Sequence, residues 1–162
     1  MQSTIQSVIG VVFSLDRQEV LLVEREDVPV WVLPGGGVEM GEAPEDAIIR
    51  EILEETGFTV KIKRLVGLYL PANKLSKVTL LYECSILHGK ETPSLETRKV
   101  QFYPRNKLPN LIPPPFPEWI EEAFTEQPII HRTIYSVNYR ALFRYFFQHP
   151  ILVLQFICKK LF

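Results

Sequence analysis

The chain has 162 residues, of which 46% are hydrophobic and 23% charged, and this composition excludes a disordered chain, a collagen and a coiled-coil rod. Its net charge of −1 gives no overall basic field for nucleic acid, and two cysteines, Cys84 and Cys158, are too few for a disulfide scaffold or a four-cysteine zinc site. The charge is unevenly spread: residues 1–126 contain 13 Lys and Arg and all 19 Asp and Glu, whereas residues 127–162 contain 5 Lys and Arg and no acid. A basic tail follows an acidic body, which indicates a separate role for the tail.

The first third of the chain predicts two strands and a glycine turn. Residues 5–13 and 20–24 are apolar and β-branched, so we expect two strands that pair as a hairpin. Residues 31–33 precede Pro34 and predict a short extended segment. The three glycines at 35–37 are expected to break all regular structure.

A helix is predicted from about Glu42 to Thr56. Pro44 suits its first turn, where a missing N–H costs little, and Gly57 suits the position just after its end. Beyond it, the β-prone segments 58–70, 78–87 and 98–103 complete a mixed α/β fold.

After residue 104 the sequence becomes rich in proline, which predicts a stiff connector. Residues 118–124 predict a short helix. Residues 133–148 and 151–161 predict two more helices in an apolar tail, separated at Pro150. Residues 1–9 do not have the pattern of a signal peptide, and no apolar stretch of about 18 residues predicts a membrane span, so we expect a cytoplasmic protein.

The residue pattern at 36–58 is typical of a metal and phosphate site. Glu51, Glu54 and Glu55 stand at i, i+3 and i+4 and therefore share one helix face. A divalent cation would relieve their repulsion, and Mg²⁺ prefers oxygen ligands and often bridges to phosphates. The preceding glycines allow close backbone approach to such a ligand. The opposite helix face can anchor to a core through Ile48, Ile49, Ile52 and Leu53.

Residues 36–58 resemble the Nudix box, G-x5-E-x7-R-E-U-x-E-E-x-G-U, where U is a bulky aliphatic or aromatic residue, at every defined position. The matching residues are Gly36, Glu42, Arg50, Glu51, Ile52, Glu54, Glu55, Gly57 and Phe58. The resemblance implies an α/β/α sandwich with a mixed β-sheet, which we assign to residues 1–130. The family pattern does not explain residues 131–162, which we assign to a C-terminal helical extension. It also implies a hydrolase that uses Mg²⁺ or Mn²⁺ to cleave a phosphoanhydride bond in a nucleoside diphosphate derivative such as ADP-ribose, or in a nucleoside triphosphate.

The same resemblance implies roles for the box residues. Glu51, Glu54 and Glu55 would bind the metal, and Glu54 is our choice to orient or deprotonate the attacking water. The carbonyl of Gly36 would join the metal ligands, and Arg50 would hold a carboxylate in position.

Some Nudix members add a carboxylate to the metal site from a later loop. Glu96 holds the comparable place here, and Glu91 is the second candidate. The alternative for Glu96 is a solvated loop acid without a role in the site.

Substrate contacts are predicted around the glycine segment. Trp31 either stacks on a base or sugar or belongs to the core. Arg25 either meets a phosphate or forms a surface salt bridge. Gly35 and Gly36 offer backbone contacts. Pro71 is similar to a downstream proline of ADP-ribose-cleaving members, although it lies a few residues closer to the box.

Other functions stay open at this point. They are a Nudix hydrolase acting on a non-nucleotide or an RNA 5′ end, a nucleotide sensor without cleavage, and a scaffold that acts through its tail. The acidic body argues against RNA and any other nucleic-acid partner, and the complete acid set argues against a sensor. The tail, residues 131–162, either folds on its own domain, pairs with a second subunit as a homodimer, or lies on an anionic membrane surface.

Overall fold

The computed structural model describes residues 5–137 and residue 140. In chain order the elements are β1 (Ser7–Val12), β2 (Glu19–Arg25), β3 (Trp31–Val32), β4 (Gly35–Gly37), α1 (Pro44–Thr56), β5 (Phe58–Pro71), β6 (Thr79–Gly89), β7 (Thr97–Pro104), α2 (Phe116–Phe124) and β8 (Ile130–Ile134). The strands form a five-stranded mixed sheet in the order β4-β1-β6-β5-β8 and a three-stranded antiparallel sheet in the order β3-β2-β7. In the larger sheet, β1 pairs with β6 in parallel and β5 pairs with β8 in parallel.

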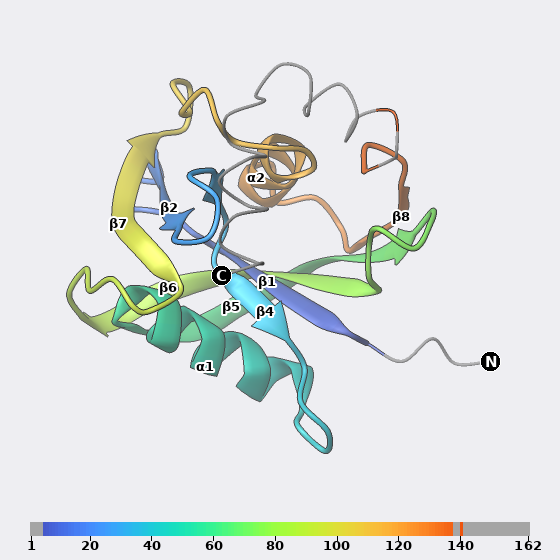
Figure 1. Ribbon diagram of the computed structural model, residues 1–162, viewed down its shortest axis with the longest axis horizontal. Helices are drawn as coiled ribbons and strands as arrows, with labels where there is room; N and C mark the ends of the chain where they lie inside the picture. The colour runs from blue at the N-terminus through green and yellow to red at the C-terminus, as the bar shows by residue number, and fades with distance from the viewer. Residues whose placement is uncertain (1–4, 138–139, 141–162) are drawn as a thin grey trace.

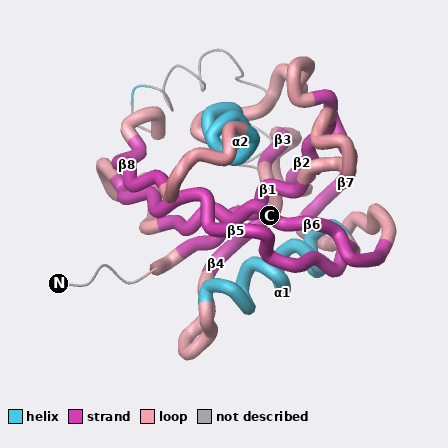
Figure 2. The backbone as a smooth tube through the Cα atoms, turned by 180° about the vertical axis from the view of Figure 1, so that it is seen from behind, coloured by secondary structure: helices cyan, strands magenta, loops and turns pink. Residues whose placement is uncertain are grey.

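The two helices cover opposite faces of the larger sheet (Figures 1 and 2). Strand β1 explains this arrangement, because its side chains alternate between the faces. Val8 packs in one core cluster with Ile48 and Ile52 of α1. Val11 packs in a second cluster with Trp119 of α2. The fold is therefore the predicted α/β/α sandwich.

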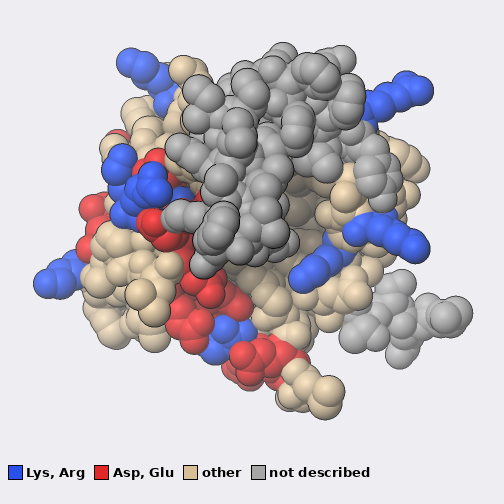
Figure 3. All heavy atoms as spheres, in the orientation of Figure 1, with Lys and Arg blue, Asp and Glu red and all other residues tan. Residues whose placement is uncertain are grey.

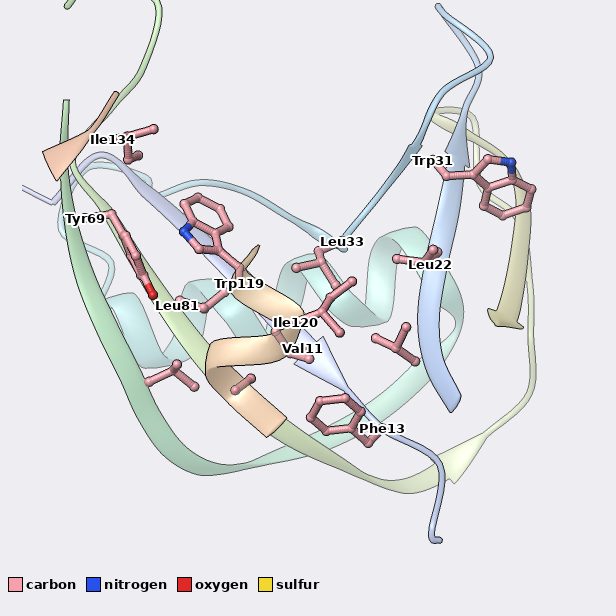
Figure 4. Close-up of a cluster of buried hydrophobic side chains, with 13 residues drawn as sticks. Val11, Phe13, Leu22, Trp31, Leu33, Tyr69, Leu81, Trp119, Ile120 and Ile134 are labelled. Carbon is pink, nitrogen blue, oxygen red and sulfur yellow. The ribbon is translucent and has the colours of Figure 1, made fainter. Parts of the chain in front are cut away.

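The second cluster holds α2 against the sheet. Figure 4 shows Trp119 and Ile120 pointing between the strands, with the indole of Trp119 beside Tyr69. The ring centroids of Trp119 and Tyr69 lie 4.8 Å apart. These aromatic contacts fix α2 over the sheet face that does not carry α1.

The predicted hairpin of the first two strands is wrong. β1 and β2 lie in different sheets and are joined by a single bridge between Phe13 and Val20. Both segments are apolar because both strands are buried. An apolar segment can be predicted to form a strand, but its sequence does not identify the strand with which it pairs.

The glycine segment is also more regular than predicted. Residues Gly35–Gly37 form β4, which pairs with β1 from Ser7 to Ile9. At Gly35 the φ angle is +148° and an added Cβ would lie 2.2 Å from the carbonyl oxygen of Val8. Glycine is required here because the two backbones approach so closely, and pairing with β1 outweighs its weak strand propensity.

The predicted box helix is confirmed as α1. It ends with Gly57 in the left-handed conformation, at φ 76°, and acids stand in its first turn. Ile48 and Ile52 are buried as predicted. Leu53 is not: it is 46% exposed, because it lies about 100° around the helix from Ile52 and beyond the buried stripe.

The start of the tail differs from the prediction as well. Thr133 and Ile134 belong to β8, which adds an edge strand beside β5, so no helix begins at residue 133. The rest of the predicted helix 133–148 from residue 141 on, and all of 151–161, lie outside the described residues. Neither helix of the described part is long and apolar enough to cross a membrane.

Candidate active site

The site forms where the middle of α1 meets β4. The carboxylate of Glu51 lies against Gly36, where an added Cβ would come within 2.5 Å of Glu51 Oε1. One turn further along the helix, Glu55 Oε2 accepts a hydrogen bond of 2.8 Å from the backbone N–H of Gly35. The structure therefore brings together two of the predicted metal ligands and both predicted backbone contacts.

Arg50 organises the carboxylates around it. Its guanidinium donates to Glu42 through Nε–Oε1 at 2.9 Å and Nη2–Oε2 at 3.0 Å. Nη1 donates to Glu51 Oε1 at 3.0 Å and to Glu54 Oε2 at 3.2 Å, and Nη2 donates to the carbonyl of Gly37 at 3.2 Å. The expectation that Arg50 holds a carboxylate agrees with this geometry, and its strongest partner is Glu42, eight residues earlier.

Acidic side chains gather in one band over α1 and the adjoining loops, with a basic group inside it (Figure 3). Burial raises the pKa of Glu55 to about 7, and the charges of Glu51 and Glu96 add to the rise. Burial also raises the pKa of Glu51. In contrast, hydrogen bonds from Arg50 lower the pKa of Glu42 to about 2. The site thus contains two carboxylates whose ionised form is disfavoured, Glu51 and Glu55, and one whose ionised form is stabilised by Arg50, Glu42.

This donor set fits a divalent cation. Carboxylate and backbone oxygens are the ligands of Mg²⁺, and a cation would offset the burial and repulsion that act on Glu51 and Glu55. Within the described ranges, no three His, Cys, Asp or Glu side chains already stand in metal-binding geometry. Arg50 binds Glu51 and Glu54 instead.

Glu96 reaches the site from the β6–β7 loop, residues 90–96. The next residue, Thr97, is hydrogen-bonded to the carbonyl of Glu55, which places this part of the chain at the C-terminal end of α1, and the charge of Glu96 contributes to the raised pKa of Glu51 and Glu55. The backbone carbonyl of Glu96 accepts a hydrogen bond of 2.9 Å from the N–H of Glu26. Of the two loop acids predicted, Glu96 is among the larger electrostatic influences on the pKa of these glutamates.

Arg25 forms the predicted salt bridge rather than standing alone. Its guanidinium binds Asp27 through Nε–Oδ1 at 2.7 Å and Nη2–Oδ2 at 2.5 Å. These hydrogen bonds raise the pKa of Arg25, and the charges of Glu55 and Glu96 contribute to the rise. The guanidinium of Arg25 is therefore held by Asp27, and it also interacts electrostatically with the acids of the site.

Trp31 belongs to the core. It is 8% exposed and packs edge to face against Tyr103, with ring centroids 4.8 Å apart. Figure 4 shows its ring on the strand layer formed by β2 and β7. Trp31 is predicted either to stack on a base or sugar or to belong to the core, and the structure supports the core position.

Sequence reasoning missed Asp27 and Thr97. Thr97, the first residue of β7, is buried and donates a hydrogen bond of 2.9 Å from Oγ1 to the carbonyl of Glu55. The two residues lie 42 positions apart, and nothing in the local sequence indicates the contact. Asp27 could have been identified from the sequence, because an acid two residues after Arg25 is close enough to form an ion pair with it. Cys84 is a buried residue of β6, and burial raises the pKa of its thiol to about 12, as is typical of an unreactive core cysteine.

The fold and the site define an α/β protein with an acidic, oxygen-rich centre at one helix. A family model, the NUDIX domain, matches residues 4–126. The chain belongs to the Nudix family.

Three comparisons illustrate the relationship. The chain is 32% identical over 99 residues to an ADP-ribose pyrophosphatase of Methanocaldococcus jannaschii, covering 57% of this chain and 59% of that protein. It is 38% identical over 96 residues to a MutT-like protein of Streptomyces ambofaciens, covering 59% and 61%. A crystal structure of a NUDIX hydrolase from Nitrosomonas europaea matches with a TM-score of 0.67 and 25% identity, covering 82% and 81%. The chain thus spans about three fifths of the length of these two curated relatives.

Proposed function

We propose that the chain is a divalent-metal-dependent hydrolase that cleaves a phosphoanhydride bond in a small nucleoside diphosphate derivative such as ADP-ribose, or in a nucleoside triphosphate. The observation that carries the proposal is the contact of α1 with β4, where Glu51 lies against Gly36 and Glu55 accepts the N–H of Gly35. Similarity to a protein named ADP-ribose pyrophosphatase, over 57% of this chain, supports the substrate class.

In this proposal Glu51, Glu54, Glu55 and the carbonyl of Gly36 would hold Mg²⁺ or Mn²⁺, together with Glu96 from the β6–β7 loop. A metal held there would supply charge that neutralises diphosphate oxygens and would lower the pKa of a water that it binds. Arg25, whose raised pKa includes contributions from the charges of Glu55 and Glu96, is the side chain that we propose to meet a phosphate of the substrate, after exchanging Asp27 for it.

Glu54 is the residue that we propose as general base. Its side chain is 59% exposed, so it can reach an incoming water, and its hydrogen bond of 3.2 Å to Arg50 keeps it on the reactive face of α1. The water oxygen attacks phosphorus in line, the bond from phosphorus to the leaving phosphate oxygen breaks, and the water proton passes to Glu54. Positioning and electrostatics supply most of the rate in such a reaction.

The test is a release assay for phosphate and nucleotide with Mg²⁺ or Mn²⁺. The panel contains ADP-ribose, nucleoside triphosphates, dinucleoside polyphosphates and sugar nucleotides. Glu54→Gln is the test variant, and Glu121→Gln, an exposed acid of α2 that pairs with Arg105, is the matched control.

Metal-dependent turnover that Glu54→Gln loses by two or more orders of magnitude, and that Glu121→Gln keeps, supports the proposal and identifies the substrate. Turnover that is unchanged in Glu54→Gln overturns the role of Glu54. No turnover on any substrate, from protein that binds Mn²⁺, overturns the proposed hydrolysis for this panel.

A further inference from the structure

The end of α1 is held by the β6–β7 loop, and this contact has consequences for the site. The last carbonyls of a helix have no partner within it. Here the carbonyl of Thr56 accepts the N–H of Thr92 at 2.9 Å, and the carbonyl of Glu55 accepts the hydroxyl of Thr97 at 2.9 Å. Both final carbonyls of the helix that carries the glutamates are therefore bound by one segment of chain.

The Thr97 hydroxyl is also connected to Glu96. A hydroxyl has one proton, and the proton of Thr97 is donated to Glu55, so the contact of 3.1 Å between the hydroxyls of Thr97 and Ser94 has Ser94 as donor. The Ser94 oxygen in turn accepts the N–H of Glu96 at 3.1 Å. A directed chain of hydrogen bonds thus runs from the amide of Glu96 through two hydroxyls to the carbonyl of Glu55.

The other side of Glu96 is fixed as well. Its carbonyl accepts the N–H of Glu26, so both backbone groups of this residue are bound. Its side chain is the exposed carboxylate whose charge acts on Glu51 and Glu55. Adding a third carboxylate to these like charges is unfavourable unless they share a cation, and the two backbone hydrogen bonds of Glu96 fix the point from which its side chain extends.

We propose that Thr97 is a positioning residue whose hydroxyl couples the β6–β7 loop to α1 and so keeps the Glu96 carboxylate toward Glu51 and Glu55. The inference rests on the proposed function, because the site must bind a divalent cation for this position to matter. Thr97 is 2% exposed, and its hydroxyl bonds the backbone carbonyl of Glu55 and, through Ser94, is linked to the amide of Glu96, so it acts through these two glutamates.

The test measures Mn²⁺ binding to the full chain by electron paramagnetic resonance, without substrate, beside kcat and KM. Thr97→Val removes the hydroxyl and keeps the shape, and Thr97→Ser keeps the hydroxyl. Thr79→Val is the matched control, because Thr79 is 4% exposed and donates to the carbonyl of Lys77 at 3.0 Å, away from the glutamates of α1.

We expect Thr97→Val to weaken Mn²⁺ binding by about 10-fold or more, which is the usual effect of removing a group that orients a metal ligand. Thr97→Ser and Thr79→Val are expected to stay within about 3-fold of the wild type. Ser94→Ala is a second variant. It removes the acceptor for the amide of Glu96 but leaves the hydrogen bond from Thr97 to Glu55. If Thr97→Val does not fold, the Mn²⁺ affinity of Ser94→Ala tests the same link.

A double-mutant cycle with Glu96→Gln separates positioning from general stability. If Thr97 acts through Glu96, Thr97→Val adds little to the loss of Mn²⁺ affinity in Glu96→Gln. Wild-type affinity in Thr97→Val, or full additivity with Glu96→Gln, overturns the inference. Wild-type protein that binds Mn²⁺ but hydrolyses nothing overturns the proposed function alone, and wild-type protein that binds no Mn²⁺ overturns both.

Discussion

The guanidinium of Arg50 and the carboxylate of Glu42 form a two-pronged ion pair, with Nε–Oε1 at 2.9 Å and Nη2–Oε2 at 3.0 Å. This pair joins the loop before α1 to the middle of the helix. It leaves Nη1 of Arg50 free to hold Glu51 and Glu54. One cation therefore sets the positions of three acids, and only arginine has a planar fork that can do so.

Arg50→Lys is expected to lower kcat by about 10- to 100-fold with the fold retained, because an ammonium has no planar fork with which to grip Glu42 by two bonds while it also bonds Glu51 and Glu54. Steady-state hydrolysis of the substrate found in the panel measures the effect, and circular dichroism checks the fold. Arg98→Lys, which changes an exposed pair with Glu26, is the control and should keep its kcat. An Arg50→Lys protein with wild-type kcat would contradict the role given to Arg50.

Two neighbouring glycines provide a second test. Gly36→Ala places a methyl 2.5 Å from the Glu51 carboxylate and should push it aside, whereas at Gly37 nothing lies within 4 Å of the added Cβ. Since the end of a flexible side chain gives way, we expect Gly36→Ala to change the free energy of unfolding by less than about 1 kcal/mol, as substitutions that leave the core intact do. Its Mn²⁺ affinity should fall well below that of Gly37→Ala. Equal affinities in the two variants would show that Gly36 and Glu51 need not be in contact.

The sequence allowed the box helix to be predicted, because caps, helical period and motif all agree over residues 44–56. It did not allow the pairing partners of the strands to be predicted, because β1 and β2 have equally apolar sequences and neither indicates the sheet to which it belongs. The position of β4 was missed because glycine propensity argued against a strand, and only β1 supplies the pairing. The bond from Thr97 to Glu55 depends on the return of a distant loop to the helix, which no local pattern records.

Trp31 gives a third prediction, which distinguishes packing from substrate stacking. Trp31→Ala should lower the free energy of unfolding by about 3–5 kcal/mol, as truncation of a buried aromatic side chain does. Trp31→Phe should keep most of the packing against Tyr103 and leave KM within about 2-fold of wild type, because the ring is buried. Urea unfolding and steady-state kinetics measure the two effects. A Trp31→Phe protein of normal stability whose KM rises 10-fold would instead support stacking on the substrate.

A fourth prediction concerns Glu83 of β6, which is 1% exposed and lies far from the glutamates of α1 in sequence. Burial works to raise its pKa, but hydrogen bonds from Lys63, Arg17 and Arg64 outweigh burial, so the pKa of Glu83 is below its ordinary value. Arg17 and Arg64 also donate to the carbonyl of Ala123 at the end of α2, so this acid ties the helix to the sheet.

Because the folded pKa of Glu83 is lowered, its contribution to stability is fully present above the pKa of an unfolded Glu, about 4.3, and is lost as the pH falls below that value. Glu83→Gln should lower the free energy of unfolding at pH 7 by about 3 kcal/mol, the lower end of the range for breaking a buried pair, since its three cations can still reach water. The difference from wild type should shrink between pH 5 and pH 3 in urea titrations. Glu121→Gln, an exposed pair with Arg105, should cost less than about 1 kcal/mol at every pH. A constant difference between wild type and Glu83→Gln across this pH range would mean that the charge of Glu83 is not what stabilises the contact of α2 with the sheet.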